Sequence, residues 1–475
     1  MNNDHAVHPG SYRDPAGFVF RSGNVYYRQV NRVYAQHYEQ LFQSDLYTAL
    51  TAGGWLIPHT EVPDNCRGDL TGGPWAEVYK ILLPRQLPFI SYPSEWSPGQ
   101  LKDAALLTLR IMRTAMDHGM ILKDASPMNI QFADGRPLFI DTLSFEKYAP
   151  SLPWVAYRQF CENFLFPLYL HHYLSTGTGV LLNAWPEGIS AEITARLLPA
   201  RSRLRLGVWL HVLLQSKVQR RTTAETQENP NRTGRDRQPS FSRDKLKNLV
   251  RNLEEIVTGI QTRMDSSSAW NNYYVSTILS QEYLVAKERI FRDLIADLTF
   301  DSALDLGAND GHFSMILAEK KALVIAADAD WQCIERLYFN TGQKGITNIL
   351  PLCVDLANPT AATGFDNKER SSFSSRASSG LVAALALVHH LAIGRNIPLD
   401  KIASSFAALT KVYLVIEFVP VEDPKVRELL RYREHFHKEY DVPSFEGHFT
   451  KYFAIEKKMT VPGTERILYL MKKMP

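Results

Sequence analysis

The chain has 475 residues, of which 45% are apolar and 22% are charged. This length exceeds what a single hydrophobic core usually organises, so we expect at least two domains of ordinary globular composition. The formal net charge of +3 is too small to indicate nucleic-acid binding, so the sequence disfavours nucleic acid as a partner.

The cysteines and the apolar runs exclude other classes of protein. The four cysteines are far apart and form no C-x-x-C pair, which disfavours a disulfide framework and a structural zinc site. The first residues lack the basic start and apolar run of a signal peptide, and the longest apolar run, Leu381 to Ile393, is too short to span a bilayer. We therefore expect a soluble, cytoplasmic protein with no membrane span, and no feature of the sequence indicates its oligomeric state.

The first half of the chain predicts a mixture of strands and helices. The expected elements are a hairpin of Phe18–Arg21 and Val25–Val30, a helix over Tyr34–Ala52, a strand within Leu87–Trp96 and a long helix over Leu101–His118.

A set of polar residues follows the predicted long helix. Asp124 lies five residues before Asn129, and a strand, an Asp-Gly turn and a second strand then lead to Asp141. This pattern resembles the catalytic loop and metal-binding aspartate of the protein-kinase and aminoglycoside-phosphotransferase fold. The resemblance implies an α+β kinase-like domain over residues 1–218. It also implies that Asp124 orients an acceptor hydroxyl, and that Asn129 and Asp141 hold the Mg²⁺ of bound Mg-ATP.

The same region departs from that family in two places. No V-A-I-K lysine is present, so Arg28 is the nearest cation in the hairpin, and Leu122 occupies the usual histidine position. A misplaced cation would neutralise phosphates less well. Three alternatives stay open for this half: phosphotransfer, ligand binding without transfer, and turn or capping roles for the three polar residues in an unrelated α/β domain.

Residues 219–243 are polar and rich in arginine, which is the composition of a flexible basic linker. Its arginines are either solvated or in contact with phosphate or an acidic membrane surface. We place the main boundary here, so that residues 244–475 form a second domain. Two helices with apolar residues at helical spacing, Lys245–Met264 and Tyr283–Leu298, are expected as its N-terminal extension.

Strands and helices then alternate to the end of the chain, which predicts an α/β, Rossmann-like domain with a mostly parallel seven-stranded sheet. We expect the last two strands to form an antiparallel hairpin, and the serine-rich stretch Asn367–Gly380 to be a mobile surface loop. The expected strands are Ala303–Leu306, Leu323–Ala327, Ile349–Val354, Leu381–Val388, Val412–Phe418, Phe453–Thr460 and Arg466–Met471.

Acidic residues and a glycine-bearing turn lie at the ends of the first three of these strands. The first strand continues into Asp305-x-Gly307-x-Asn309-x-Gly311. Glycine permits positive φ and a close approach of backbone to ligand, and asparagine is among the few other residues that tolerate this geometry. Asp328 ends the second strand and Asp355 follows the third. Together these features resemble the class I S-adenosylmethionine-dependent methyltransferases.

The resemblance implies a role for each residue toward S-adenosylmethionine. The turn from Asp305 through Gly307 and Asn309 to Gly311 would hold the amino-acid part of the cofactor, Asp328 its ribose hydroxyls, and Asp355 would lie near its adenine amino group. Carboxylates accept two donors at once, and a cationic sulfonium tolerates nearby acids. The turn lacks the G-x-G-x-x-G spacing of redox dinucleotide sites. Asn309 departs from the family pattern, in which glycine is commoner.

Two histidines follow the fourth strand. His389 and His390 could line the acceptor pocket or act as a general base, or they could merely orient the loop and cap the next helix. The D/N-P-P-Y signature of DNA base methyltransferases is absent. We therefore expect methyl transfer to a small-molecule or glycan-like acceptor, with phosphotransfer by the first half or a non-catalytic nucleotide-binding scaffold as alternatives.

Overall fold

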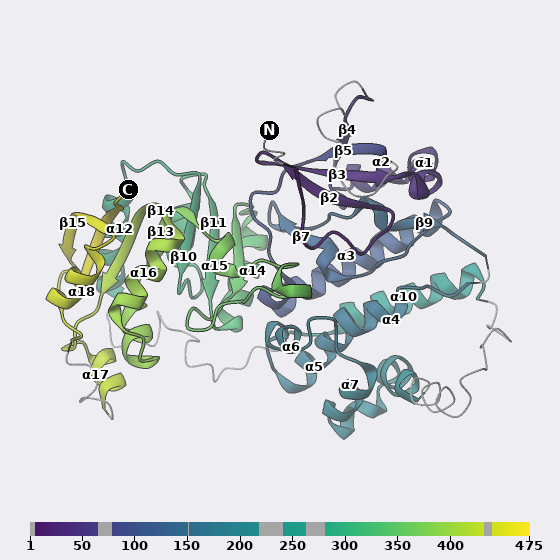
Figure 1. Cartoon of the computed structure of the whole chain (residues 1–475). Helices are drawn as coiled ribbons and strands as arrows, with labels where there is room; N and C mark the ends of the chain where they lie inside the picture. Colours follow the sequence, from purple (N-terminus) through teal and green to yellow (C-terminus); the bar gives the residue numbers. More distant parts are fainter. Residues whose placement is uncertain (1–4, 65–77, 151, 218–240, 263–280, 432–438) are drawn as a thin grey trace. The chain divides into compact units, whose positions relative to one another are not determined.

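The computed structural model describes residues 5–64, 78–150, 152–217, 241–262, 281–431 and 439–475, and it divides into two compact units (Figure 1). Unit 1 comprises Met1–Met264 and Ala362–Arg370, and unit 2 comprises Asp265–Ala361 and Ser371–Pro475. Most of the predicted linker over residues 219–243, namely residues 219–240, lies outside the described residues. Within the described ranges, no helix has both the length and the apolar character needed to cross a membrane.

Unit 1 combines a small sheet with a largely helical part. In chain order its main elements are β1 (His5–Val7), β2 (Gly17–Ser22), β3 (Val25–Asn31), α1 (Ala35–Gln43), α2 (Leu46–Ala52), β4 (His59–Glu61), β5 (Val78–Pro84), α3 (Pro98–Asp117), β6 (Met120–Leu122), β7 (Ile130–Ala133), β8 (Arg136–Phe139), β9 (Phe145–Lys147), α4 (Tyr157–Phe160), α5 (Phe166–Leu174), α6 (Thr178–Ala184), α7 (Ala191–Leu197), α8 (Leu206–Val208), the π-helical turn η8 (Trp209–Leu214) and α10 (Arg243–Gly259).

The sheet of unit 1 has five antiparallel strands in the order β1-β2-β3-β5-β4, and β7 and β8 form a separate hairpin. The predicted β2–β3 hairpin and the long helix α3 are confirmed. The predicted helix over Tyr34–Ala52 is two helices, because Asp45 between them adopts a left-handed φ of 59°. The strand expected within Leu87–Trp96 is wrong: Pro88 and Pro93 lack the amide donors that a sheet strand needs, and the fifth strand is β5 instead.

Helix α10 belongs to unit 1, whereas we expected it to begin the C-terminal domain over residues 244–475. It packs along α3. Lys247 and Asp117 form an ion pair at 2.6 Å, and Arg113 and Glu254 form another at 2.9 Å. The apolar stripe of an amphipathic helix shows that the helix is packed but not which element covers it. The boundary predicted from composition is therefore displaced toward the C-terminus.

Unit 2 is an α/β domain. In chain order its elements are α12 (Gln281–Ile295), β10 (Ser302–Leu306), α13 (His312–Ala318), β11 (Leu323–Asp328), α14 (Trp331–Lys344), β12 (Ile349–Cys353), α15 (Phe373–Arg376), β13 (Ser379–Ala384), the π-helical turn η10 (His390–Gly394), α16 (Leu399–Leu409), β14 (Thr410–Phe418), α17 (Pro424–Leu430), α18 (Val442–Phe449), β15 (Phe453–Thr460) and β16 (Ile467–Lys473).

One seven-stranded sheet runs through unit 2 in the order β12-β11-β10-β13-β14-β16-β15. Strands β10 to β14 are parallel, and β16 pairs antiparallel with both of its neighbours, so the expected final hairpin is confirmed. The expected α/β, Rossmann-like class is also confirmed. Strand order reverses between β10 and β13, and such a switch point leaves a crevice outside the carboxyl ends of the strands.

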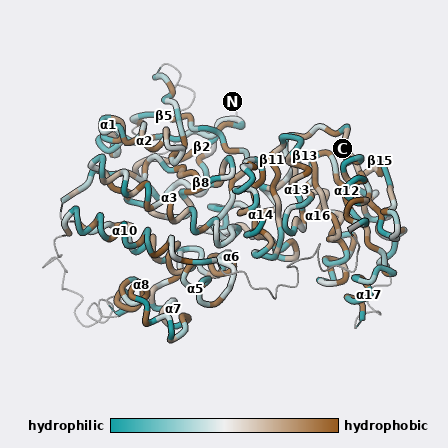
Figure 2. The backbone as a smooth tube through the Cα atoms, turned by 180° about the vertical axis from the view of Figure 1, so that it is seen from behind, coloured by the Kyte–Doolittle hydropathy of each residue, from teal (hydrophilic) through white to brown (hydrophobic). Residues whose placement is uncertain are grey.

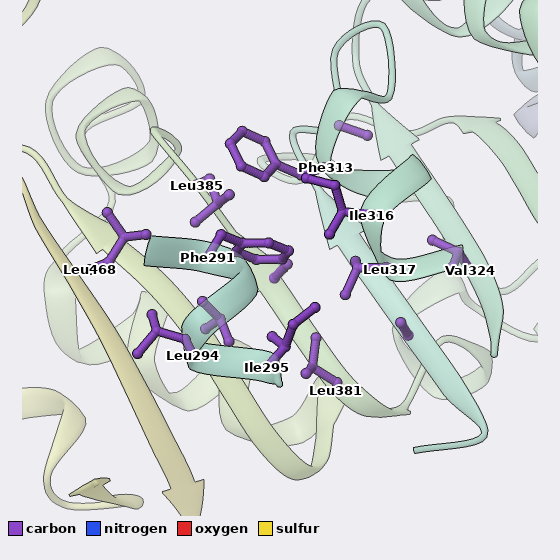
Figure 3. Close-up of a cluster of buried hydrophobic side chains, with 14 of the residues drawn as sticks. Phe291, Leu294, Ile295, Phe313, Ile316, Leu317, Val324, Leu381, Leu385 and Leu468 are labelled. Carbon is purple, nitrogen blue, oxygen red and sulfur yellow. The ribbon is translucent and has the colours of Figure 1, made fainter. Parts of the chain in front are cut away.

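A hydrophobic core fixes α12 and α13 beside the sheet. Figure 3 shows Phe291 and Leu294 of α12 directed toward the same layer as Phe313 and Leu317 of α13. The rings of Phe291 and Phe313 lie 5.1 Å apart in an edge-to-face arrangement. Full burial of each such ring stabilises the fold by about 1.5–3 kcal/mol. This packing holds the start of α13, and with it the turn that follows β10, against the end of the sheet.

The serine-rich stretch after β12 is not simply the surface loop that we expected. Its second part contains the short helix α15, in which the Ser375 amide donates to the Ser372 hydroxyl at 3.3 Å. Phe373 in this helix is almost fully buried. A single aromatic residue among serines therefore anchors the connection, although composition favoured a loop.

The first part of that stretch lies in residues 362–370, which belong to unit 1. Glu369 accepts hydrogen bonds from the Tyr12 hydroxyl and, at 2.7 Å, from Arg13. Arg370 forms an ion pair with Glu187 at 3.1 Å. Burial raises the pKa of Glu369, but the hydrogen bonds from Tyr12 and Arg13 outweigh burial and hold the pKa at about 2. A short piece of chain between two elements of unit 2 is thus built into unit 1.

Candidate functional site

A pocket of about 270 Å³ lies at the carboxyl ends of β10 to β13 in unit 2. The structure brings together on its wall six of the residues that the sequence predicted for the C-terminal site: Asp305, Gly307, Asn309, Asp328, Asp355 and His390. Gly311 and His389 do not line it. The pocket therefore coincides with the switch point of the sheet.

The turn between β10 and α13 depends on left-handed backbone geometry. Gly307, Asn309 and Gly311 have φ angles of 73°, 51° and 86°. A Cβ atom on Gly311 would lie 2.3 Å from a methyl carbon of Leu337, which real structures do not permit. Gly311 thus shapes the turn through packing, while Gly307 and Asn309 present backbone to the pocket.

Asp328 ties this turn to the end of β11. One carboxylate oxygen accepts the amide of Asn309 and the other accepts the amide of Asp330, each at 2.8 Å. Burial raises the pKa of Asp328, and these amide hydrogen bonds oppose the rise. Since a carboxylate has about four acceptor positions, Asp328 keeps capacity for further donors from the pocket.

Asp305 is 2% exposed at the end of β10. The Ser314 hydroxyl donates to it at 2.6 Å. Burial raises the pKa of Asp305 to about 6, against the opposing effect of this hydrogen bond. No sequence pattern identifies Ser314. Its hydroxyl reaches Asp305 only because the turn after β10 and the first turn of α13 fold the chain back on the end of the strand.

Asp355 forms the outer rim of the pocket. Its carboxylate accepts the Ala357 amide at 2.9 Å and pairs with Arg395 at 3.0 Å. Arg395 lies at the end of η10, forty residues further along the chain, so sequence reasoning missed it. The pair places one exposed cation beside one acid at the open side of the pocket.

The two predicted histidines have different positions. His390 lines the pocket, and burial lowers its pKa to about 4, which leaves the ring neutral above about pH 5. His389 is fully buried behind it, with the ring centroids 4.1 Å apart, and burial lowers its pKa further. Of the two roles that the sequence left open for each histidine, lining the pocket fits only His390, because the chain turns into η10 at this point and His389 is not part of the pocket wall.

A buried charged residue that the sequence analysis missed also lines the pocket. Lys287 of α12 lies 2.6 Å from Glu417, a fully buried acid in β14. Burial raises the pKa of Glu417, but Lys287 and Arg466 outweigh this and lower it overall. Lys287 is four residues before Phe291 on the apolar stripe of α12. A lone cation in such a stripe was the signal that could have revealed it.

In unit 1 the structure also brings Asp124, Asn129 and Asp141 together. Burial raises the pKa of Asp124, and hydrogen bonds that include one from Asn129 oppose the rise. Asp141 accepts hydrogen bonds from the Leu143 amide at 3.0 Å and from the Ser144 hydroxyl.

Asp141 also forms an ion pair with Arg28, the cation that the sequence placed in the β2–β3 hairpin. Both oxygens of the predicted metal ligand are therefore already occupied by protein donors.

Comparison with known proteins defines the family. No protein-family model matches the chain. The nodulation protein NoeA of Rhizobium meliloti (strain 1021) is 30% identical over 467 residues, which cover 98% of this chain and 95% of that protein. The chain belongs to the NoeA family.

Two solved structures similar to this NoeA-family chain each cover less than half of it. The N-methyltransferase NodS from Bradyrhizobium japonicum WM9, in complex with S-adenosyl-l-homocysteine, is 12% identical over 44% of this chain and 94% of that one, with a TM-score of 0.33. A SAM dependent methyltransferase from Aquifex aeolicus is 15% identical over 45% of this chain and 100% of that one, with a TM-score of 0.32. At TM-scores this low, neither likeness carries an argument about the pocket.

The chemistry of the NoeA-family pocket follows from its own walls. Carboxylates at three adjacent strand ends offer hydrogen-bond acceptors, and Val354, Leu356 and Leu387 supply apolar surface between them. This combination suits a ligand that carries hydroxyl and amino donors next to a flat apolar group.

The cluster in unit 1 does not fit Mg-ATP. Mg²⁺ prefers carboxylate oxygens that are free to coordinate it. Arg28 and Ser144 hold the oxygens of Asp141 instead.

Proposed function

We propose that unit 2 binds S-adenosylmethionine and transfers its methyl group to a small-molecule or glycan-like acceptor. The observation that carries this proposal is the order of the acids: Asp305 and Asp328 lie at the carboxyl ends of β10 and β11, Asp355 follows β12, and all three face one pocket beside the left-handed turn at Gly307.

Each group in the pocket has a role toward that cofactor. The backbone from Gly307 to Asn309 receives the amino-acid part, with the buried Asp305 behind it. The unfilled acceptor positions of Asp328 suit paired ribose hydroxyls, and Asp355 suits an exocyclic amino group. When bound, the cofactor supplies an electrophilic methyl group on a sulfonium, whose positive charge the surrounding acids favour.

The acceptor side of the pocket is formed by His390, Phe313 and Lys287. A neutral imidazole accepts one hydrogen bond and donates another, so His390 can orient a hydroxyl or amine of the acceptor. Its low pKa makes it a weak base, which favours positioning over proton removal. The aromatic face of Phe313 suits a carbon ring or chain of the acceptor.

Isothermal titration calorimetry with S-adenosylhomocysteine tests cofactor binding directly. We expect binding heat with the wild-type protein and none with Asp328→Ala, because this variant removes the acceptors for ribose. Asp328→Asn keeps the size of the side chain and separates loss of charge from loss of shape. Asp293→Ala changes an exposed acid in helix α12, where alanine is well tolerated, and serves as the matched control. No heat with wild type, or unchanged affinity in Asp328→Ala, would refute the proposal.

For unit 1 we propose a kinase-like fold without phosphotransfer. The five-stranded sheet, the long helix α3 and the β7–β8 hairpin that separates Asp124 from Asp141 support the fold. The ion pair between Arg28 and Asp141 disfavours metal binding. We expect no heat on titration with Mg·ATP. Binding that disappears in Asp141→Ala would restore phosphotransfer as the leading alternative for this unit.

A non-catalytic scaffold is the remaining alternative. Incubation of the full-length protein with isotopically labelled cofactor and cell extract distinguishes it from an enzyme. We expect a labelled product of low molecular mass with wild type, and none with Asp328→Ala. Cofactor binding without any labelled product would favour the scaffold.

A further inference from the structure

A helical face of unit 1 exposes apolar side chains to solvent. In the continuous helical segment formed by α8 and η8, Leu206 is 74% exposed and Trp209 is 49% exposed, and Leu210 and Leu214 are also exposed. Figure 2 shows the hydrophobic colouring of the chain at α8. We call this set of four residues the Leu206–Leu214 face.

The spacing of these residues shows that the face is organised. Positions 206, 209, 210 and 214 follow the i, i+3, i+4, i+8 pattern of one side of a helix. The opposite side of the same segment is also apolar, since Val208 and Val212 are buried in unit 1. A surface helix normally presents polar residues to water. A second apolar stripe therefore indicates a surface that a binding partner covers when the protein functions.

Basic residues border the face at its N-terminal end. Arg201, Arg203 and Arg205 are exposed and alternate with Leu204, which is 90% exposed. The two nearest acids before them in the chain, Glu187 and Glu192, form ion pairs with Arg370 and Arg196. The sequence contains no Asp or Glu from Ile193 to Lys217. The surface is therefore apolar and cationic at once.

We propose that the Leu206–Leu214 face docks on the surface of a lipid bilayer that contains anionic lipids. Leucine and tryptophan side chains partition into the boundary between headgroups and acyl chains, where the indole ring is especially favoured. Exposed arginines beside them meet lipid phosphates and gain affinity from the negative surface potential. The segment is too short to span the bilayer, so it lies in the plane of the interface.

Charge complementarity distinguishes this occupant from a protein partner. Arg203 and Arg205 flank the exposed Leu204, Arg205 also precedes the exposed Leu206, and Arg201 lies three residues before Leu204, so positive charge lies within the apolar surface, as in helices that bind anionic lipid surfaces. The proposal does not depend on methyl transfer, because it concerns unit 1 alone.

Vesicle flotation with the full-length protein tests the proposal. We expect the wild-type protein to float with vesicles of phosphatidylcholine and phosphatidylglycerol, and to remain unbound with vesicles of phosphatidylcholine alone. Added salt should release it. Each arginine near the surface contributes about fivefold in partitioning, so Arg201→Gln/Arg203→Gln/Arg205→Gln should weaken binding by roughly 100-fold.

A second variant tests the apolar part of the face. Leu206→Ser/Trp209→Ser/Leu210→Ser should abolish flotation, whereas Val33→Ser, at an exposed valine in the 3-10 turn that follows β3, should leave it unchanged. Circular dichroism and the melting temperature establish that each variant is folded. Failure of the wild type to bind anionic vesicles, or equal binding by the folded variants, would overturn the proposal. Self-association that disappears in the serine variant without any vesicle binding would assign the face to a second copy of the chain, which also overturns it.

Discussion

Substitution of Asp305 by asparagine should stabilise the protein at neutral pH. Asp305 is fully buried, and burial raises its pKa from 3.8 to about 6 although Ser314 donates a hydrogen bond to it. A pKa difference of about 2 between the folded and unfolded states corresponds to about 3 kcal/mol of unfolding free energy at pH 7. The asparagine side chain would carry no charge into the core and could still accept the Ser314 hydroxyl.

The sign of the pH dependence follows from the raised pKa. Well below pH 4 the carboxyl is protonated in both states and costs nothing. As pH rises from about 4 to 6, the unfolded state loses its proton first, so the wild-type protein loses stability through this interval. The gain in Asp305→Asn should therefore be near zero at pH 4 and approach about 3 kcal/mol at pH 7.

Urea unfolding of both proteins at several pH values, followed by circular dichroism, measures this difference. The two proteins share all their other titratable groups. The difference between their free energies of unfolding at each pH therefore reports the ionisation of Asp305. A variant that is less stable than the wild type at pH 7, or a difference that does not change between pH 4 and 7, would show that burial does not dominate the ionisation of Asp305.

Three further predictions concern the same unit. Gly311→Ala should destabilise unit 2 by several kcal/mol in urea unfolding, because the added methyl group meets a leucine side chain at 2.3 Å. The control Gly463→Ala, with a φ of 76° and nothing within 4 Å, should cost only about 1 kcal/mol. Similar losses of stability in the two variants would refute the steric argument. Lys287→Met should destabilise by about 3 kcal/mol, at the low end for loss of one buried partner, since Glu417 keeps Arg466 at 3.6 Å and the Tyr283 hydroxyl at 2.9 Å. Lys287→Met/Glu417→Gln should recover most of that loss in the same assay, and no recovery would show that packing, not charge, was lost. In an NMR titration the imidazole of His390 should show its inflection near pH 4, and one near 6.5 would contradict its burial.

The positions of the strands in unit 2 were predictable because their signal is local. Apolar runs that end in an acid identified β10 and β11 to within one residue at their ends. Strand β13 ends at Ala384, four residues earlier than expected, because Ala386 adopts a left-handed φ of 51°. Alanine has no preference for left-handed backbone geometry, so the sequence does not predict this bend. The bend nevertheless directs the chain so that Leu385 and Leu387 line the pocket.

The acids of the pocket were predictable and their partners were not. Asp305, Asp328 and Asp355 stand at strand ends, and parallel strands bring their carboxyl ends to one edge. Lys287 and Arg395 reach that edge from a helix and a turn whose placement depends on tertiary packing. The sequence therefore identified the acceptors of the site but not the cations that balance them.

The segment around Glu369 affects how this protein can be divided or recombined. The chain passes from unit 1 to unit 2 after Met264, returns for residues 362–370, and leaves again at Ser371. A fragment that starts in the described part of unit 2 carries these nine residues away from Tyr12 and Arg13, and a fragment that ends near residue 264 lacks them. The two units therefore cannot be exchanged as separate stretches of sequence. A chimera that takes unit 1 from a relative must also take residues 362–370 from that relative.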